Sequence, residues 1–222
     1  MRILVISVHP DDETLGCGGT ILKHNLAGDD VHWLILTHAQ SFKNWSDGKK
    51  KRRNHEIQLV AERYSFKSVA ILNFETTRLD VYPMNDLVFE ISRVIKQVLP
   101  DTIYLHNRSD VHSDHQVSFR AIISATKTFN NPGLRRLLTY ETVSETEFAP
   151  AFSENAFCPN YFVDISEFME EKLSIFNIYE SEIKEHPFPR SNKNIKALAT
   201  FRGAQCGVEY AEAFMILKDI WQ

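Results

Sequence analysis

The sequence predicts an α/β fold, with a mostly parallel β-sheet and helices on both of its faces. The main observation is that short apolar runs rich in β-branched residues alternate along the chain with longer stretches of helical periodicity. A second observation is that acidic and histidine side chains directly follow two of the apolar runs, where open α/β sheets place their ligands. The chain has 222 residues, enough to bury a substantial core, and we expect residues 1–222 to form a single domain.

The apolar runs expected to be strands are 3–8, 31–37, 69–72, 102–105, 137–140, 161–164 and 213–217. The stretches expected to be helices are 14–27, 49–64, 86–98, 113–126, 166–178 and 194–202, with Ser166 as the N-cap of the fifth. This alternation is typical of a Rossmann-like sheet. The last third of the chain is expected to form a small C-terminal elaboration that covers the strand ends.

The composition narrows the class of partner. Hydrophobic residues make up 43% of the chain, charged residues 24%, and the net charge is −4, which argues against nucleic acid or an anionic membrane as the main partner. No apolar run is long enough to span a bilayer, and the N-terminus lacks the pattern of a signal peptide. Three widely spaced cysteines suit a reducing compartment, so we expect a cytoplasmic protein. A homo-oligomer is compatible with the sequence, which does not fix the oligomeric state.

The first polar cluster is His9-Pro-Asp-Asp-Glu13, between the first expected strand and the first expected helix. It places His9, Asp11 and Asp12 together at the end of a buried strand. Closely packed carboxylates repel each other unless a cation or a shared proton compensates. A fold has no structural need for such a cluster, whereas metal binding beside a general base does need it.

The second cluster runs from His106 to His115 and follows the expected strand 102–105. His112 and His115 lie around the start of the next helix, where residues three apart share a face. We therefore expect His112, Asp114 and His115 to converge on the pocket that holds the first cluster. Asp110 either contacts another site residue or stabilises the loop through an Asx turn.

Together the clusters predict a catalytic metal site. His9, Asp12 and His115 supply the two-histidine, one-carboxylate ligand set that catalytic zinc takes, with a position left open for water. Iron, cobalt or nickel could bind the same set. The metal makes its bound water acidic enough to attack near neutral pH, and it polarises a carbonyl.

Three further residues are predicted to take part in catalysis. Asp11 is expected to point away from Asp12 and to remove the proton of the water as general base. His112 is expected either to stabilise the developing oxyanion or to protonate the leaving group. Asp114 is expected to hydrogen-bond His112, which would fix its tautomer and favour its protonated form. These parts fit the hydrolysis of an amide or an ester.

The two motifs resemble the paired signatures of the PIG-L/LmbE-like deacetylases, zinc-dependent hydrolases that remove acetyl groups from N-acetylglucosamine-type sugars. The likeness spans nearly the whole chain and includes Leu15-Gly-Cys-Gly-Gly-Thr20, Arg53-Asn-His-Glu56 and Tyr210-Ala-Glu-Ala-Phe214. The resemblance implies the same ligands and general base as above, with Arg53 reaching the sugar hydroxyls or the anomeric substituent. It also makes Arg190 a candidate for binding an anionic group such as a nucleotide phosphate.

The function predicted is therefore removal of the N-acetyl group from an N-acetylated sugar or sugar conjugate, a small-molecule substrate. The alternatives are a metal-dependent amidase or esterase acting on another acyl group, and a non-catalytic metal or sugar binder. A dinucleotide-binding module is disfavoured, because Gly16-Cys-Gly-Gly19 lacks the spacing of a phosphate loop and follows three acidic residues.

The chain departs from the family pattern in the loop Thr37-His-Ala-Gln40, in the loop 73–78, and at Ser113, which replaces the common proline. These loops are expected to shape the sugar pocket, so they leave the identity of the sugar open. Cys17 is near the site but is interpreted as a buried core thiol rather than a ligand. Trp45 is interpreted as a core or rim residue rather than one that stacks on a sugar ring.

Overall fold

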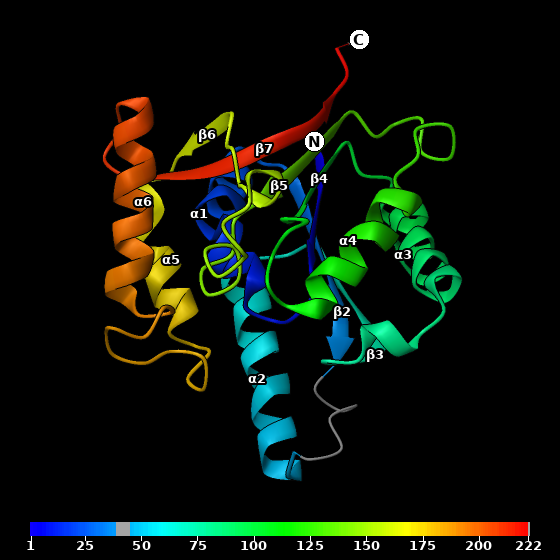
Figure 1. The fold of residues 1–222 in the computed structure, drawn as a ribbon, viewed down its shortest axis with the longest axis horizontal. Helices are drawn as coiled ribbons and strands as arrows, with labels where there is room; N and C mark the ends of the chain where they lie inside the picture. The colour runs from blue at the N-terminus through cyan, green and yellow to red at the C-terminus, as the bar shows by residue number, and fades with distance from the viewer. Residues whose placement is uncertain (39–44, 222) are drawn as a thin grey trace.

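The computed structural model describes residues 1–38 and 45–221, and these form a seven-stranded sheet of order β3-β2-β1-β4-β5-β7-β6 (Figure 1). The strands are β1 (Arg2–Ser7), β2 (Asp30–His38), β3 (Ser68–Glu75), β4 (Thr102–His106), β5 (Arg136–Tyr140), β6 (Tyr161–Asp164) and β7 (Ala211–Asp219). The α-helices are α1 (Asp12–Leu26), α2 (Asp47–Arg63), α3 (Met84–Val98), α4 (Ser113–Ala125), α5 (Met169–Phe176) and α6 (Asn192–Cys206). The predicted α/β class is confirmed.

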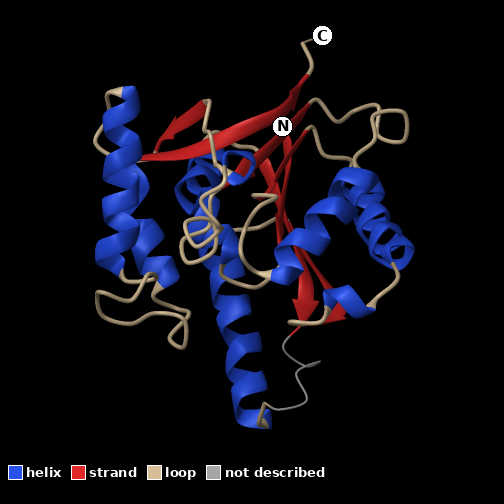
Figure 2. Cartoon of the chain, viewed as in Figure 1, coloured by secondary structure: helices blue, strands red, loops and turns tan. Residues whose placement is uncertain are grey.

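Helices cover both faces of the sheet (Figure 2). Along β1, Ile3 and Val5 pack into the core beneath α1, α2, α5 and α6, while Leu4 and Ile6 pack into the core beneath α3 and α4. This alternation is the two-residue period of a strand, and because both faces of β1 are buried, its sequence is continuously apolar.

The first five strands run parallel, and β1 lies between β2 and β4. The helix after β1 crosses one face of the sheet, whereas the helix after β4 crosses the other (Figure 1). The chain therefore leaves the carboxyl ends of β1 and β4 in opposite directions. Such a switch point opens a crevice at the strand ends, where α/β proteins bind their ligands.

The helix α1 is kinked at Cys17, whose backbone dihedrals (φ −146°, ψ 25°) are not helical. The kink leaves backbone groups that a buried ion pair satisfies. Glu212 of β7 accepts hydrogen bonds from the amides of Gly19 and Thr20 at 2.9 and 2.7 Å, and from Lys172 of α5 at 2.7 Å. Lys172 in turn donates to the carbonyl of Leu15 at 3.0 Å. The pair thus joins α5 and β7 to α1, the helix that carries Asp12.

Close approach of α1 to the sheet depends on Gly16. A Cβ atom at that position would lie 2.1 Å from Cδ2 of Tyr140 on β5. The ring of Tyr140 is fully buried, and its hydroxyl donates to the carbonyl of Ile6 at 2.9 Å. Tyr140 is therefore a core residue.

The last third of the chain extends the sheet and also reaches the strand ends. β7 pairs antiparallel with both β5 and β6, and Arg190, between α5 and α6, contacts Asp11 at the end of β1. The prediction of Ser166 as an N-cap is wrong: its amide donates to Asp164 at 2.9 Å, and it begins a short 3-10 helix before α5. Among the described residues, no helix combines the length and apolarity needed to cross a membrane.

Candidate metal centre and its pocket

The two predicted clusters meet at the switch point. His9, Asp11 and Asp12 follow β1, while His112, Asp114 and His115 lie at the start of α4, just beyond β4. The structure therefore brings together all six of the residues predicted to act as ligands or in catalysis. The distances and contacts among them decide which can act together.

Within the described residues, His9, Asp12 and His115 form a group whose ligand atoms all lie within 4.8 Å of one another. Oδ2 of Asp12 lies 3.4 Å from Nε2 of His115 and 3.9 Å from Nδ1 of His9. In a tetrahedral zinc site with bonds of about 2.0–2.1 Å, the ligand atoms are separated by about 3.3 Å. The three side chains thus need only small adjustments to grip one ion.

The group is held in place by contacts of its own. Oδ2 of Asp12 accepts the amides of Val8 and His9 at 3.0 and 2.9 Å, which fixes the carboxylate against the end of β1. Asp110 Oδ2 lies 2.8 Å from Nδ1 of His115. Asp110 was expected either to contact another site residue or to stabilise the loop through an Asx turn, and the structure supports the contact with a site residue. That contact leaves Nε2 of His115 to face Asp12.

The donor set fits a metal ion. Nε2 of His115 is buried and makes no hydrogen bond to any described residue, which is unusual for a buried nitrogen and suits a coordinating one. Burial opposes protonation of His115, yet the carboxylates of Asp12 and Asp110 raise its pKa well above the usual value. The surroundings of this ring therefore favour a positive charge, which a divalent ion would supply. His9 is partly exposed and lines the adjoining cavity, so the group borders a space that a substrate can enter.

Asp11 points away from Asp12, as predicted. Its Oδ2 accepts a hydrogen bond from Nη1 of Arg190 at 2.8 Å, and it contributes to the wall of a cavity of about 170 Å³ beside the metal group. Burial raises the pKa of Asp11 well above its usual value, although the neighbouring Arg190 opposes this. A buried carboxylate with a raised pKa is a stronger base than an exposed one.

The predicted contact between Asp114 and His112 is not the one observed. The carboxylate of Asp114 lies 3.2 Å from Nε2 of His9 and accepts the amides of Thr77 and Leu79 at 2.6 and 3.0 Å. Only the backbone amide of Asp114 reaches His112, donating to Nδ1 at 3.1 Å. His112 is the N-cap of α4, and this is why its Nδ1 is engaged.

The charge state expected for His112 is therefore wrong as well. Burial, together with repulsion from His9 and His115, lowers the pKa of His112 to about 4. The ring is neutral near pH 7. Because its Nδ1 accepts a hydrogen bond, its proton is on Nε2. The ring centroid lies 4.6 Å from that of His9, so His112 is close enough to the metal group to donate to a ligand there.

Both predicted substrate-binding arginines line the cavity. Arg53 of α2 is buried and donates to the carbonyl of Pro10 at 3.2 Å and to Glu182. Arg190 contacts Asp11, Glu182 and Glu145, the last at 3.3 Å. With three carboxylates around it, Arg190 is poorly suited to bind a further anion, which counts against the phosphate interpretation.

Glu182 and Glu145 were missed by the sequence analysis, because both lie in irregular segments without a motif. Trp45 lines the same cavity, with the guanidinium carbon of Arg53 5.9 Å from its ring centroid. Of the predicted pocket loop after β2, residues 39–44 lie outside the described residues. Cys17 is fully buried in the core beneath α1, as expected, and does not line this cavity.

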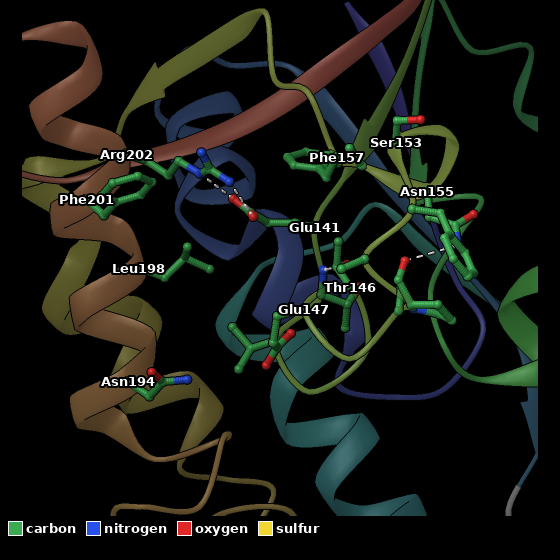
Figure 3. A pocket seen from close by; sticks show the side chains of 17 residues that line it. Glu141, Thr146, Glu147, Ser153, Asn155, Phe157, Asn194, Leu198, Phe201 and Arg202 are labelled. Carbon is green, nitrogen blue, oxygen red and sulfur yellow. Dashed lines mark hydrogen bonds and ion pairs between the residues drawn. The ribbon is translucent and has the colours of Figure 1, made fainter.

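A larger cavity of about 630 Å³, here called the side cavity, lies between α6 and the segment 141–157 (Figure 3). Arg202 of α6 forms a two-point ion pair with Glu141 at its wall. Thr146, which also lines the side cavity, donates to Oδ1 of Asp110 at 2.7 Å. The segment therefore separates the side cavity from the metal group and supports His115 through Asp110.

Comparison with known proteins identifies one matching family and several solved structures that share the fold of this chain. The PIG-L family model, described as GlcNAc-PI de-N-acetylase, matches residues 4–126. The diacetylchitobiose deacetylase of Thermococcus kodakarensis is 28% identical over 234 residues, covering 99% of this chain and 84% of that protein.

Two solved structures share the fold along nearly the whole chain. The N,N'-diacetylchitobiose deacetylase from Pyrococcus horikoshii has a TM-score of 0.76 at 22% identity, covering 97% of this chain and 83% of that one. The 4-carboxy-2-hydroxymuconate hydratase GalB from Pseudomonas putida has a TM-score of 0.73 at 19% identity, covering 100% and 98%. Because this fold also occurs in a hydratase, function has to be argued from the site.

Proposed function

This chain belongs to the PIG-L family, and we propose on that basis that it is a metal-dependent N-deacetylase of an N-acetylated amino sugar or of a conjugate of such a sugar. The observation that carries the proposal is the convergence of His9, Asp12 and His115 on one point, with Asp11 at the wall of the adjoining cavity. The metal is zinc, whose usual catalytic ligands are histidine and carboxylate.

A divalent ion at this point would polarise the acetyl carbonyl and lower the pKa of the attacking water. Asp11 takes a proton from that water as its oxygen bonds to the carbonyl carbon. The C–N bond then breaks, and the proton held by Asp11 passes to the leaving nitrogen, so that a free amine and acetic acid result, and the acid ionises to acetate on release. Arg190 keeps the Asp11 carboxylate directed at the cavity by its 2.8 Å contact.

The hydrogen bond accepted by Nδ1 of His112 favours one of the two predicted roles of this residue. A neutral ring with its proton on Nε2 can donate a hydrogen bond to the developing oxyanion, but at pH 7 it is not a ready source of a proton for the leaving group. Asp114 acts on the ligand His9 rather than on His112, since its carboxylate lies 3.2 Å from Nε2 of that ring. We therefore assign Asp114 to orientation of the metal site.

The sugar would occupy the cavity lined by Arg53, Arg190 and Trp45. The guanidinium groups and Glu182 can hydrogen-bond adjacent hydroxyls, while the ring of Trp45 offers an apolar face. The volume of about 170 Å³ is small, which matches one sugar ring better than an extended chain.

The test measures metal content and acetate release together. We expect about one metal ion per chain, as for a single three-ligand site. The variant His115→Ala should lose the metal, whereas Asp11→Asn should keep it and lose about 100- to 10,000-fold in kcat. The control is His55→Ala, an exposed histidine of α2, which should change neither quantity.

Two results would contradict the proposal. Equal acetate release by wild type and Asp11→Asn would refute the general-base assignment. If the protein hydrolysed other acyl amides or esters but none of a panel of N-acetyl sugars, the proposed substrate class would be wrong.

A further inference from the structure

The acidic residue that closes the first motif, Glu13, has no role in the chemistry described so far. It is fully buried. Among the described residues it belongs neither to the group His9, Asp12 and His115 nor to a second group with metal-ligand spacing, which consists of His9, His112 and Asp114. Both of its oxygens are engaged by donors. Oε1 accepts from the hydroxyls of Thr14 at 2.7 Å and Tyr179 at 2.8 Å, and Oε2 accepts from the amide of Asp11 at 3.1 Å. The buried carboxylate of Glu13 therefore accepts hydrogen bonds from three different residues.

The amide that Glu13 holds belongs to a strained residue. Asp11 has φ 145° and ψ −27°, a backbone conformation that residues with a Cβ rarely adopt. Glycine would adopt it readily, but glycine has no carboxylate to act as a base. The chain thus keeps an aspartate where the backbone geometry favours glycine.

This conformation separates the two neighbouring carboxylates. Asp12 faces His115 at 3.4 Å, while Asp11 contacts Arg190 at 2.8 Å and lines the cavity. With the backbone in this conformation, one carboxylate is placed to act as a ligand and the other to act as a base. The hydrogen bond from the Asp11 amide to Glu13 fixes the backbone on one side, and Arg190 fixes the side chain on the other.

Tyr179 connects this contact to the substrate pocket. It lies beyond the end of α5, is fully buried, and donates its hydroxyl to Glu13. The guanidinium carbon of Arg53 lies 5.5 Å from the centroid of its ring. A single residue from the C-terminal half therefore contacts both Glu13 and the arginine at the cavity wall.

We propose that Glu13, supported by Tyr179, is a positioning residue that holds the backbone of Asp11 in its strained conformation and so presents the general base to the cavity. This inference depends on the proposed function for its catalytic consequence. Its structural part, that Glu13 maintains the strain at position 11, stands independently and can be measured without substrate.

The structural test compares thermal unfolding of Asp11→Gly and Asp11→Ala. Both variants lack the carboxylate and its contact with Arg190, so this loss cancels in the comparison. The remaining difference between them is how well each residue tolerates φ 145°. In an otherwise wild-type chain, Asp11→Gly should melt several degrees higher than Asp11→Ala. In a Glu13→Ala background, where the amide is released, the difference should fall to less than half. An unchanged difference would overturn the proposal.

The catalytic test uses Glu13→Ala, Glu13→Gln and Tyr179→Phe. We expect Glu13→Ala to keep its metal and its KM but to lose about 10- to 100-fold in kcat, as when a reacting group is displaced slightly. Glu13→Gln retains an oxygen that can accept the Asp11 amide and should recover much of the loss. Tyr179→Phe retains the ring beside Arg53 and should show a smaller fall in kcat.

The outcomes separate this inference from the proposed function. If the wild-type protein releases no acetate from any N-acetyl sugar, the proposed function fails, while the melting comparison still tests Glu13. If the wild type is active and Glu13→Ala has the same kcat or loses its metal, the positioning role is refuted. Should Glu13→Ala not fold, Tyr179→Phe, which removes the hydroxyl that supports Glu13, replaces it as the background of the melting comparison, and an unchanged melting difference together with an unchanged kcat would then overturn the proposal.

Discussion

Replacing Lys172 by methionine should destabilise the protein strongly. Lys172 Nζ lies 2.7 Å from Oε1 of Glu212, and both side chains are only 4% exposed. Methionine has a similar length and fills the same space, so packing is largely kept. What remains is the Glu212 carboxylate, buried without its cation, and the carbonyl of Leu15 without its donor.

The cost can be estimated from the burial of the pair. Removing one partner of a buried ion pair costs about 3–5 kcal/mol, because the other charge stays desolvated. Because the amides of Gly19 and Thr20 still donate to Glu212, we expect the loss of stability to lie toward the lower end of this range. For a chain of this size, about 1 kcal/mol shifts Tm by 2–4 °C, so we expect a fall of at least 6 °C.

Urea denaturation followed by circular dichroism measures this free energy of unfolding directly. The matched control is Lys196→Met, because Lys196 pairs with Glu170 at 2.5 Å but both side chains are well exposed to solvent. That surface pair should contribute about 1 kcal/mol or less. If Lys172→Met lost no more stability than Lys196→Met, the ion pair would not be what supports the kink in α1.

Three further outcomes are expected. Gly203→Ala should destabilise the fold by about 1–3 kcal/mol in urea denaturation, because its Cβ would lie 2.6 Å from backbone carbonyl oxygens, whereas Gly133→Ala, with open space, should be nearly neutral. Burial lowers the pKa of His106 to about 3, so on going from pH 7 to 5 the unfolded chain gains a proton that the folded chain does not. The metal-free protein should lose about 2 kcal/mol from this residue over that range, and a His106→Gln variant with the same pH dependence would contradict it. Asp110→Ala should weaken metal affinity about 10- to 100-fold in a competition titration, since it removes the contact with Nδ1 of His115; unchanged affinity would show that Asp110 does not orient the ligand.

Much of the fold could be predicted because its signals are local. The run before His9 is apolar at every position, which is typical of a strand buried on both faces, and β1 is that strand. The position of β7 between β5 and β6 could not be predicted in the same way. Strand order depends on pairing between residues far apart, and a short run such as 213–217 fits an edge or an interior strand equally well.

The site was predictable as a set of residues but less so as a set of contacts. The spacing of His112 and His115 places both at one helix start, and the structure brings them together with His9. The partner of Asp114 was predicted wrongly, because being two residues from His112 says nothing about which way a carboxylate turns at an N-cap. The contact made instead, with His9, spans 105 positions in the sequence and follows only from the tertiary fold.

The insertion of β7 has a consequence for synthesis on the ribosome. β6 is made some fifty residues before β7, yet its hydrogen-bonded neighbour in the described sheet is β7. Glu212, which satisfies the amides exposed by the bend in α1, also arrives with β7. The helix bearing Asp12 therefore cannot make these contacts until the segment that forms β7 has been synthesised.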